Sequence, residues 1–353
     1  MKHRANLNLN PNPNPNLNRS RRHSRRTALR TVVMSAIAVT ATSFVSLSSL
    51  SPLSASAAAP MVKKSAPGYF RMMLGDFEVT ALSDGTVNLP MDKLLKNSSA
   101  DATNKAFAKY YLKSPIETSV NTYLINTGAK LVMIDTGAAG LFGPTLGNLI
   151  ANLKASGYQP EQIDEIYITH MHGDHIGGLM AGDKLAFPNA TIRADKRDAD
   201  YWLSQANMDK ASADDKGGFQ GAMASINPYV KAGKFSPFQG NTDLVPGVKA
   251  MSSYGHTAGH TTYVVESKGE KLALWGDLMH AAAVQFDKPS VTIAFDSDHK
   301  AAAAERAKAY ADAAKNGYIV GAAHLSFPGM GRLRANATGG GYTWVPVNYT
   351  VLR

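Results

Sequence analysis

The sequence predicts an α/β domain in which sheets and helices form layers. Short β-branched and aromatic runs alternate with helical segments in both halves of the chain, a pattern typical of layered α/β folds. Histidine and aspartate residues stand directly beside several of the predicted strands, which is where sites form in such sheets. No repeat and no linker rich in Pro, Gly or Ser divides residues 60–353, so we expect one large domain there.

The predicted strands are β-branched or aromatic and are bounded by Gly, Asp or Asn. They cover residues 77–82, 122–125, 131–134, 165–169, 190–194, 262–265, 271–275 and 318–323. The predicted helices cover residues 144–156, 198–205, 221–231 and 299–315. In the first of these helices, four aliphatic side chains share one face at helical spacing, namely Leu146, Leu149, Ile150 and Leu153.

The net charge of +10 comes mostly from the N-terminal segment. Residues 1–59 hold eight Lys and Arg residues and no acidic residue, which leaves residues 60–353 at about +2. A body this close to neutral lacks the basic surface that nucleic-acid binding requires. With 44% hydrophobic and 18% charged residues, the composition is that of an ordinary globular protein. We therefore expect no nucleic-acid partner.

The N-terminal segment resembles an export signal. Residues 1–18 are a low-complexity run without aromatic residues, which predicts disorder. An Arg-rich segment at 19–30, a weakly apolar stretch at 31–50 and an Ala-x-Ala sequence before Pro60 follow, and these are the three parts of a secretory signal. Residues 1–59 are thus expected to be a disordered N-terminus plus signal peptide, and residues 60–353 the functional domain.

The Arg-rich segment decides the kind of export that we expect. Residues 24–29 are similar to a bacterial twin-arginine signal, with Ala28 in place of the usual Phe. Cleavage is expected after Ala57 or Ala59, which predicts a periplasmic or secreted protein without stable membrane association. An uncleaved anchor helix is the alternative, because about 20 residues can span a bilayer, but the many Ser and Thr residues of the stretch disfavour it.

Residues 165–178 carry the most informative motif, in which a predicted strand leads into His170, His172, Asp174 and His175. The chain has no cysteine, which excludes disulfide scaffolds, zinc fingers, iron–sulfur sites and thiol nucleophiles. Imidazole and carboxylate are the ligands that a zinc-type ion accepts when thiolates are lacking. One ion cannot be held comfortably by all four side chains, so the motif predicts two ions side by side.

Further candidates flank other predicted strands. His256 and His260 belong to the sequence Gly-His-Thr-Ala-Gly-His, Asp277 follows the strand at 271–275, and His324 follows the strand at 318–323. Each of them lies beside an apolar strand, as ligands at the edge of a sheet would. The sequence therefore predicts that the candidate metal-binding residues lie at the ends of strands from both halves of the chain.

These motifs, in this order, are similar to those of the metallo-β-lactamase superfamily of binuclear hydrolases, and Asp135-Thr-Gly137 matches its early motif. The resemblance covers residues 66–350. It implies a four-layer αββα sandwich with the metals in the cleft between the two β-sheets. Within the superfamily the chain looks most like the methyl parathion hydrolase group. Four segments carry this likeness, at residues 65–70, 135–145, 221–228 and 324–329.

The resemblance implies a ligand role for seven residues. One divalent ion is expected on His170, His172 and His256, the other on Asp174, His175 and His324, and Asp277 is expected to bridge them. Zinc is the expected metal, with manganese, cobalt or iron as alternatives. Asp135 and His260 are expected to lie behind the ligands and orient them. Loop structure or capping is the alternative for Asp135, and a core histidine held by the backbone is the alternative for His260.

A pair of such ions predicts hydrolysis. Two ions about 3.5–4 Å apart lower the pKa of a shared water and yield a metal-bridging hydroxide near neutral pH. We expect that hydroxide to attack a carbonyl or phosphoryl centre whose oxygen one ion polarises. Asp174 and Asp277 are the expected catalytic carboxylates, and Asp174 is also a candidate proton shuttle.

The group that the chain resembles has two activities: hydrolysis of aryl organophosphate triesters, and hydrolysis of aromatic lactones or aryl esters. The resemblance places Phe142, Trp202 and Phe219 at the mouth of the site, although aromatic residues also serve plain core packing. It further implies a homodimer.

The chain departs from the organophosphatase pattern on the other side of the pocket. Leu94 stands where Arg is expected, His280 and Phe295 stand for Leu, and Ile293 stands for Thr. Phe and His narrow the leaving-group side, and His280 can donate a hydrogen bond to a departing phenolate or a lactone oxygen. We therefore expect lactone and aryl-ester hydrolysis of the dihydrocoumarin type, with weak triesterase activity. A true organophosphate triester hydrolase is the alternative.

Two other classes are disfavoured. β-Lactamases with a Cys ligand are excluded by composition, and the bridging Asp277 argues against the remaining ones. A non-catalytic metal-binding module would be expected to have lost ligands, whereas all seven are present.

Overall fold

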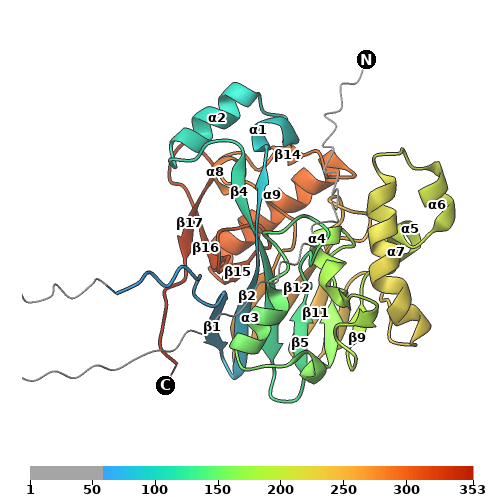
Figure 1. Ribbon diagram of the computed structural model, residues 1–353. Helices are drawn as coiled ribbons and strands as arrows, with labels where there is room; N and C mark the ends of the chain where they lie inside the picture. Colours follow the sequence, from blue (N-terminus) through green and yellow to red (C-terminus); the bar gives the residue numbers. More distant parts are fainter. Residues whose placement is uncertain (1–58, 353) are drawn as a thin grey trace, which may run out of the picture. The chain divides into compact units, whose positions relative to one another are not determined.

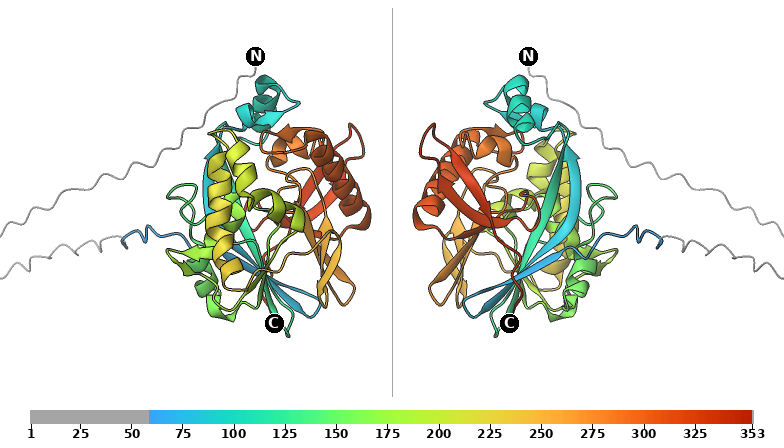
Figure 2. Two further views of the ribbon diagram at one scale, coloured as in Figure 1. Left: turned by 90° about the vertical axis from the view of Figure 1, so that its right-hand side faces the viewer. Right: turned by 90° about the vertical axis from the view of Figure 1, so that its left-hand side faces the viewer.

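Two mixed β-sheets face each other in the computed structural model, which describes residues 59–352, and helices cover their outer faces (Figure 1). The described chain from Ser65 onward forms one compact unit. The order of layers is helix, sheet, sheet, helix, as Figure 2 shows from two sides. The predicted disorder at 1–18 and the predicted signal segment lie outside the described residues, except for Ala59. Within residues 59–352, no helix combines the length and apolar character needed to cross a membrane.

The first sheet has six strands in the order β1-β2-β4-β5-β6-β9. They are β1 (Tyr69–Leu74), β2 (Phe77–Leu89), β4 (Ile116–Asn126), β5 (Leu131–Ile134), β6 (Glu165–Tyr167) and β9 (Thr191–Arg193). The pairs from β1 to β5 are antiparallel, whereas β5, β6 and β9 run parallel. The carboxyl ends of β5 and β6 therefore meet at one edge, where Asp135 and the motif of residues 170–175 begin.

The second sheet has seven strands in the order β10-β11-β12-β13-β15-β16-β17. They are β10 (Thr242–Val245), β11 (Val248–Ser252), β12 (Thr261–Ser267), β13 (Glu270–Leu274), β15 (Ile319–Gly321), β16 (Met330–Ala335) and β17 (Tyr342–Pro346). Strands β13 and β15 are parallel, so the residues after both strands reach the same edge. Two small ladders pair β3 (Leu95–Lys96) with β14 (Thr292–Ile293) and β7 (Met180–Ala181) with β8 (Lys184–Leu185).

Nine α-helices are described in the structure, together with the 3₁₀ turns η1 (Pro160–Gln162) and η2 (Gly177–Leu179). The helices are α1 (Met91–Leu94), α2 (Ala100–Ala108), α3 (Leu149–Ala155), α4 (Gly173–Ile176), α5 (Lys196–Trp202), α6 (Gln205–Lys210), α7 (Lys216–Lys231), α8 (Ala282–Gln285) and α9 (His299–Asn316). Asp298 caps α9 through the backbone N–H groups of Lys300 and Ala301, and Gly317 ends it at a φ of 65°.

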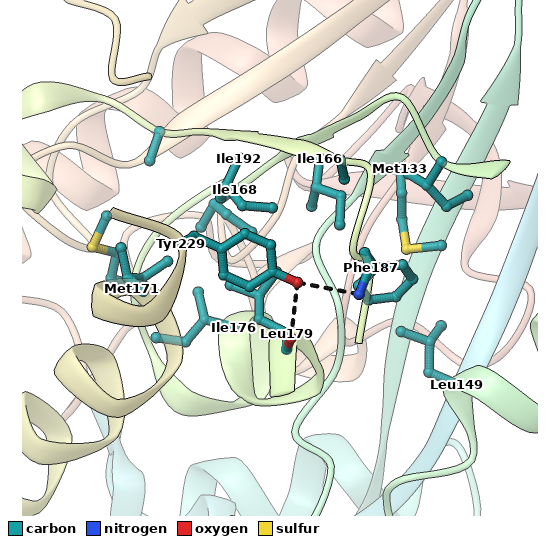
Figure 3. Close-up of a cluster of buried hydrophobic side chains, with 14 of the residues drawn as sticks. Met133, Leu149, Ile166, Ile168, Met171, Ile176, Leu179, Phe187, Ile192 and Tyr229 are labelled. Carbon is teal, nitrogen blue, oxygen red and sulfur yellow. Dashed lines mark hydrogen bonds between the residues drawn. The ribbon is translucent and has the colours of Figure 1, made fainter. Parts of the chain in front are cut away.

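Three buried apolar clusters hold the layers together. The first joins α3, α4 and α7 to the outer face of the first sheet. In it, the Tyr229 hydroxyl donates to the Leu179 carbonyl at 2.9 Å and accepts from the Phe187 N–H at 3.2 Å (Figure 3). The second cluster fills the space between the sheets, and the third packs α9 on the second sheet. The predicted α/β sandwich of four layers is confirmed.

All four predicted helices differ from the observed ones at an end. The helix predicted at 221–231 begins at Lys216, and the helix predicted at 299–315 ends at Asn316. The helix predicted at 144–156 begins only at Leu149, because residues 144–148 turn through Gly147 at a φ of 88°. Leu146 therefore packs in a separate small cluster with Val120 and Ala138, and its predicted place on the helix face was wrong. The helix predicted at 198–205 ends at Trp202, because the Ser204 side chain caps α6.

Candidate metal centre

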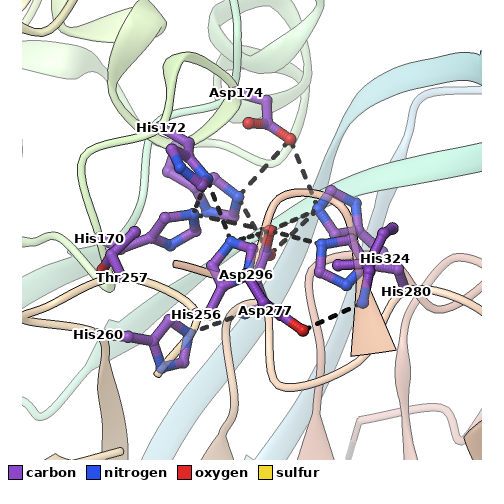
Figure 4. A network of polar contacts seen from close by, with 12 residues as sticks. His170, His172, Asp174, His256, Thr257, His260, Asp277, His280, Asp296 and His324 are labelled. Atoms are coloured by element: carbon purple, nitrogen blue, oxygen red, sulfur yellow. Dashed lines mark hydrogen bonds and ion pairs between the residues drawn. The ribbon is translucent and has the colours of Figure 1, made fainter. Parts of the chain in front are cut away.

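The seven residues predicted as metal ligands converge at one edge of the two facing sheets (Figure 4). Four come from the loop and short helix after β6, one from the loop between β11 and β12, one from the turn after β13 and one from the turn after β15. In chain order they are His170, His172, Asp174, His175, His256, Asp277 and His324. Segments as far apart as 154 residues therefore meet because parallel strands deliver them to the same edge.

Three histidines and Asp277 form the first group, in which the candidate ligand atoms all lie within 4.8 Å of one another. The His172 Nδ1 atom is 3.0 Å from His170 Nε2 and 3.1 Å from His256 Nε2. The Asp277 Oδ2 atom lies 3.3 Å from His256 Nε2 and 3.6 Å from His170 Nε2. Three nitrogens and one oxygen thus surround a common point.

The second group contains Asp174, His175, His324 and again Asp277. The Asp277 Oδ1 atom lies 3.1 Å from the Nε2 atoms of both His175 and His324. The Asp174 Oδ2 atom is 3.6 Å from His175 Nε2 and 3.5 Å from His324 Nε2. The Oδ2 atom of Asp277 faces the first group and also lies 3.1 Å from His324 Nε2. The Asp277 carboxylate therefore contacts both groups, as a carboxylate that bridges two ions does.

The outward nitrogens of four histidines donate hydrogen bonds, which fixes the tautomers of the inward ones. His175 Nδ1–H donates to Asp135 Oδ2 at 2.8 Å, His256 Nδ1–H to Asp296 Oδ1 at 2.8 Å, and His324 Nδ1–H to the Ser119 carbonyl at 2.9 Å. His170 Nδ1–H lies 3.1 Å from Thr169 Oγ1, whose own proton goes to Asp135 Oδ2. In their neutral forms all four rings consequently aim an unprotonated Nε2 at the centre.

These residues fit a pair of divalent cations. The Nε2 atoms of His170 and His256 both lie within 3.0–3.1 Å of His172 Nδ1, close enough for one cation to bind all three nitrogens. The buried His175 Nε2 and Asp277 Oδ1 atoms make no hydrogen bond, so their lone pairs are free for a ligand. Imidazole and carboxylate in this ratio suit zinc-type ions in a chain without thiolates.

The electrostatics of the cluster also favour cations. Burial raises the pKa of Asp277, but the surrounding histidines outweigh burial and hold it well below its usual range. Burial lowers the pKa of His256, yet the hydrogen bonds and charges of Asp277 and Asp296 raise it to about 9. Burial and the neighbouring histidines lower the pKa of both His170 and His172. The carboxylates thus draw positive charge to the centre.

Asp135 holds histidines of both groups. It is buried, follows β5 at a φ of 61° and also accepts the Thr169 N–H at 2.7 Å. Its second oxygen reaches His175 directly and His170 through Thr169. The structure therefore places Asp135 behind the candidate ligands, and the left-handed backbone conformation aims its carboxylate there.

His260 lies under the shared carboxylate. Its Nε2 atom accepts the backbone N–H of Asp277 at 3.0 Å, and its Nδ1 atom lies 3.1 Å from the Ser253 carbonyl. Burial and the nearby His256 lower the pKa of His260 to about 3, which keeps the ring neutral and able to accept. His260 is therefore both satisfied by the backbone and in position to orient Asp277.

Asp198 belongs to the site although sequence reasoning missed it. This buried carboxylate at the start of α5 accepts the N–H of Met171 at 3.0 Å, the N–H of Gly259 at 2.6 Å and the Thr257 hydroxyl at 2.9 Å. It joins the loop of His170 and His172 to the loop of His256 and His260. Burial raises its pKa to about 6 in spite of these hydrogen bonds.

Aromatic side chains form one wall beside the first group. The Trp202 ring lies 5.4 Å from His172 and 4.9 Å from Phe219 between ring centroids. Phe142 is 41% exposed and lies close to Gly173, whereas Phe219 is buried. Of the three predicted mouth residues, Trp202 and Phe142 thus have rings near the loop of ligands, and Phe219 supports Trp202 from behind.

The other four predicted pocket residues lie on the side of the metal centre opposite the aromatic wall. Leu94 and Ile293 are buried in an apolar cluster below α1 and α2. Phe295 is 38% exposed, and its ring lies 6.1 Å from that of His280. His280 itself is buried, stacks on His324 and places Nε2 3.0 Å from Asp277 Oδ2. It therefore contacts the shared carboxylate as well as the pocket side.

Comparisons with known proteins agree with this geometry. The family model of the metallo-beta-lactamase superfamily matches residues 115–324. The crystal structure of the hydrolase AbOPH, in the beta lactamase superfamily, is 37% identical with a TM-score of 0.77, over 82% of this chain and 100% of that one. AidC, a dizinc quorum-quenching lactonase, is 26% identical with a TM-score of 0.71, over 80% of this chain and 99% of that one.

A curated relative matches over a shorter stretch. The N-acyl homoserine lactonase of a Bacillus species is 26% identical over 165 residues, which are 41% of this chain and 58% of the lactonase. The chain thus spans less than two thirds of that relative.

Proposed function

The chain belongs to the metallo-beta-lactamase superfamily and has the architecture of a binuclear metal-dependent hydrolase, and from this premise we propose that it hydrolyses aromatic lactones and aryl esters. One observation carries the proposal most directly. An aromatic wall reaches to within 5.4 Å of His172, beside two ligand groups that share Asp277. A flat aromatic ester would stack on that wall with its carbonyl over the metal groups.

When bound, two divalent ions activate water and polarise the oxygen of the scissile bond. The chain's own residues place and protect this chemistry. Asp277 ties both groups together and is itself held by His260 from below and His280 from the side. The side chain of Asp174 is 21% exposed, against 3% for that of Asp277. Asp174 is therefore the carboxylate that can pass a proton between the reacting water and solvent through its Oδ atoms.

The substrate side of the site favours uncharged, flat molecules. The aromatic wall and the opposite side offer apolar contacts, and His280 is the one ionisable side chain among the seven pocket residues. Burial lowers the pKa of His280 to about 4, so its ring is neutral near pH 7. A tetrahedral triester needs more room between Phe295 and the aromatic wall than a bicyclic lactone of the dihydrocoumarin type.

Organophosphate triester hydrolysis is the second candidate. It is supported by the 37% identity to the hydrolase AbOPH and by the segments that resemble the methyl parathion hydrolase group. Membership of that group is part of the proposal. N-acyl homoserine lactones are a further lactone class to test, because the lactonase AidC was solved in complex with the ring-opened product N-hexanoyl-L-homoserine.

Metal, location and assembly complete the proposal. Zinc is the proposed metal, supported by the nitrogen and oxygen ligand set and by the dizinc site of AidC. Export through a cleaved twin-arginine-like signal at residues 1–59 and the domain boundary at residue 60 rest on the sequence motif alone. The homodimer rests on the resemblance to the methyl parathion hydrolase group.

A substrate panel tests the proposed function. The purified mature protein, loaded with zinc, is assayed with dihydrocoumarin, phenyl acetate, N-hexanoyl homoserine lactone and methyl parathion. We expect the highest kcat/KM with dihydrocoumarin and measurable, lower values with methyl parathion. A higher kcat/KM with methyl parathion would establish the triesterase alternative, and bound metal without any turnover would favour a non-catalytic module.

A further inference from the structure

Arg306 is completely buried beneath the metal centre. It lies in α9, with no exposed surface on its side chain. Its Nε–H donates to the Leu278 carbonyl at 2.5 Å, and its Nη1–H donates to the carbonyls of Val291 at 2.7 Å and Pro289 at 3.0 Å. One guanidinium thus fastens two loops to α9. Leu278 directly follows the shared ligand Asp277.

Asp296 connects Arg306 to a ligand histidine. The side chain of Asp296 has no exposed surface, and its Oδ2 atom lies 3.8 Å from Arg306 Nη2. The other oxygen, Oδ1, accepts the Nδ1–H of His256 at 2.8 Å. Oδ2 also accepts the backbone N–H of Ile293 at 3.1 Å. Figure 4 draws Asp296 and His256 within the same network of polar contacts.

This pair is costly to bury. Removing two charges from water carries a desolvation penalty that a packed apolar pair would avoid. Among the described residues, Asp296 is the one acidic side chain within 4.0 Å of the Arg306 guanidinium, and Nη2 makes no hydrogen bond. Arg306 satisfies three backbone carbonyls of the surrounding loops. Asp296 accepts hydrogen bonds from the Ile293 N–H and from the ligand His256, which ties the buried pair to the metal centre.

We propose that Arg306 and Asp296 are positioning residues that form a buried chain to His256 and set the affinity of the first metal group. The Arg306 charge attracts the Asp296 carboxylate, whose Oδ2 atom is held by the Ile293 N–H. Asp296 in turn holds the His256 ring in the tautomer that aims Nε2 at the centre. Arg306 also fixes the turn that carries Asp277. This inference rests on the proposed metal centre but not on any substrate.

The contacts from Arg306 and Asp296 to His256 should affect the metal affinity of the two groups unequally. His175 and His324 of the second group are held by Asp135 and the Ser119 carbonyl, neither of which contacts Asp296 or Arg306. Loss of the Asp296 charge should therefore weaken one metal equivalent and spare the other. Carboxylates behind ligand histidines typically change metal affinity by about 10–100-fold when removed.

The first experiment compares Asp296→Asn with Asp298→Asn. The second substitution makes the same chemical change two residues away, and Asn caps a helix as well as Asp does. Zinc affinity is measured by competition with a chromophoric chelator. We expect the Asp296 variant to keep one tight equivalent and to bind the other about 10–100-fold more weakly, and the Asp298 variant to match wild type. Two equivalents of wild-type affinity in the Asp296 variant would overturn the proposal.

Cobalt substitution identifies which group is weakened. The visible spectrum of the Asp296→Asn variant with one cobalt equivalent is compared with those of His256→Ala and His324→Ala. A spectrum that matches His256→Ala supports the proposal, because both variants would retain the second group. A match to His324→Ala contradicts it. Neither outcome depends on which ester the protein hydrolyses, so a wrong substrate assignment leaves the result readable.

The role of Arg306 is tested by measuring zinc affinity in single variants and in a double variant with Asp296. Arg306→Met removes the charge at similar length, and Arg306→Lys keeps the charge but loses the planar fork. We expect weaker zinc binding in the Met variant and partial recovery in the Lys variant. In the Asp296→Asn/Arg306→Met double variant the losses should be smaller than additive, because one chain is broken twice. Strictly additive losses would show that the two residues act separately, and circular dichroism of each variant verifies that it is folded.

Discussion

The Nε2 atom of His260 accepts the backbone N–H of Asp277 at 3.0 Å. Directly before Asp277, Gly276 adopts a φ of 54°, and a Cβ there would come within 2.9 Å of both His260 Nε2 and the Thr169 side chain. The turn that presents the shared carboxylate thus lies directly against two supporting side chains. Orientation of Asp277 depends on these contacts as much as on its own rotamer.

Replacing His260 should loosen both metal groups together. His260→Ala removes the acceptor under the Asp277 backbone, so the shared carboxylate gains freedom and zinc affinity should fall about 10–100-fold for both equivalents. Equilibrium zinc competition measures this effect. His260→Gln, whose side-chain oxygen can accept the same N–H, should recover part of the loss. Unchanged affinity in the Ala variant would show that the hydrogen bond has no orienting role.

Asp198→Ala should destabilise the protein strongly. It leaves the N–H groups of Met171 and Gly259 and the Thr257 hydroxyl without their acceptor in a buried place, and each such group costs about 1–3 kcal/mol. We expect a loss of about 3 kcal/mol or more in the free energy of unfolding, measured by urea denaturation.

The control for Asp198 is an exposed aspartate of the same helix. Asp200 pairs with Lys196 on the surface, and surface ion pairs contribute about 0–1 kcal/mol. Asp200→Ala should therefore change the unfolding free energy by less than about 1 kcal/mol. Equal effects of the two substitutions would refute the linking role of Asp198.

The fold and the candidate ligands were accessible from the sequence for a physical reason. Strand composition and the density of His and Asp within a few residues are local signals, and they predict a layered α/β domain with a metal site. The four-layer arrangement was an expectation from the resemblance to the metallo-β-lactamase superfamily. The structure then brings all seven candidate ligands together. Helix starts were less accessible, because the turn at Gly147 outweighs the helical spacing of nearby leucines.

The supporting charges were not accessible in this way. Asp296 meets His256 across 40 residues, and Asp198 meets Thr257 across 59. Each is a single aspartate in an unremarkable segment, and Arg306 has the pattern of a surface residue in a helix rich in Ala and Lys. Their roles arise only when loops from different layers pack against one another, which no local pattern encodes.

Gly178→Ala should disrupt the loop that carries Asp174 and His175. A Cβ at this position would lie 1.9 Å from the Thr136 carbonyl oxygen, and Thr136 in turn donates its N–H to the His175 carbonyl at 2.7 Å. Overpacking of this kind costs about 1–3 kcal/mol or more. We expect that loss in urea denaturation, together with reduced zinc content.

Gly217 provides the matched control for this substitution. It lies in α7, and a Cβ there would meet nothing within 4 Å. Ala is preferred over Gly inside helices by about 0.8–1.0 kcal/mol, so Gly217→Ala should leave zinc content unchanged and raise stability slightly. A Gly178 variant that behaves like the Gly217 variant would mean that the loop can shift without cost to the site.

Phe295→Leu should shift substrate preference toward triesters. The partly exposed Phe295 ring lies 6.1 Å from His280, so shortening it opens the side of the pocket where a tetrahedral phosphorus centre needs room. It also removes apolar contact with a flat lactone. Changes of this size alter discrimination by about 10–200-fold. The ratio of kcat/KM for methyl parathion to that for dihydrocoumarin should therefore rise at least about tenfold.

Tyr69→Leu, at an equally exposed aromatic residue of β1, should leave that ratio unchanged. A fall in the ratio for the Phe295 variant would place the steric limit on triesters elsewhere, with the aromatic wall around Trp202 as the next position to open.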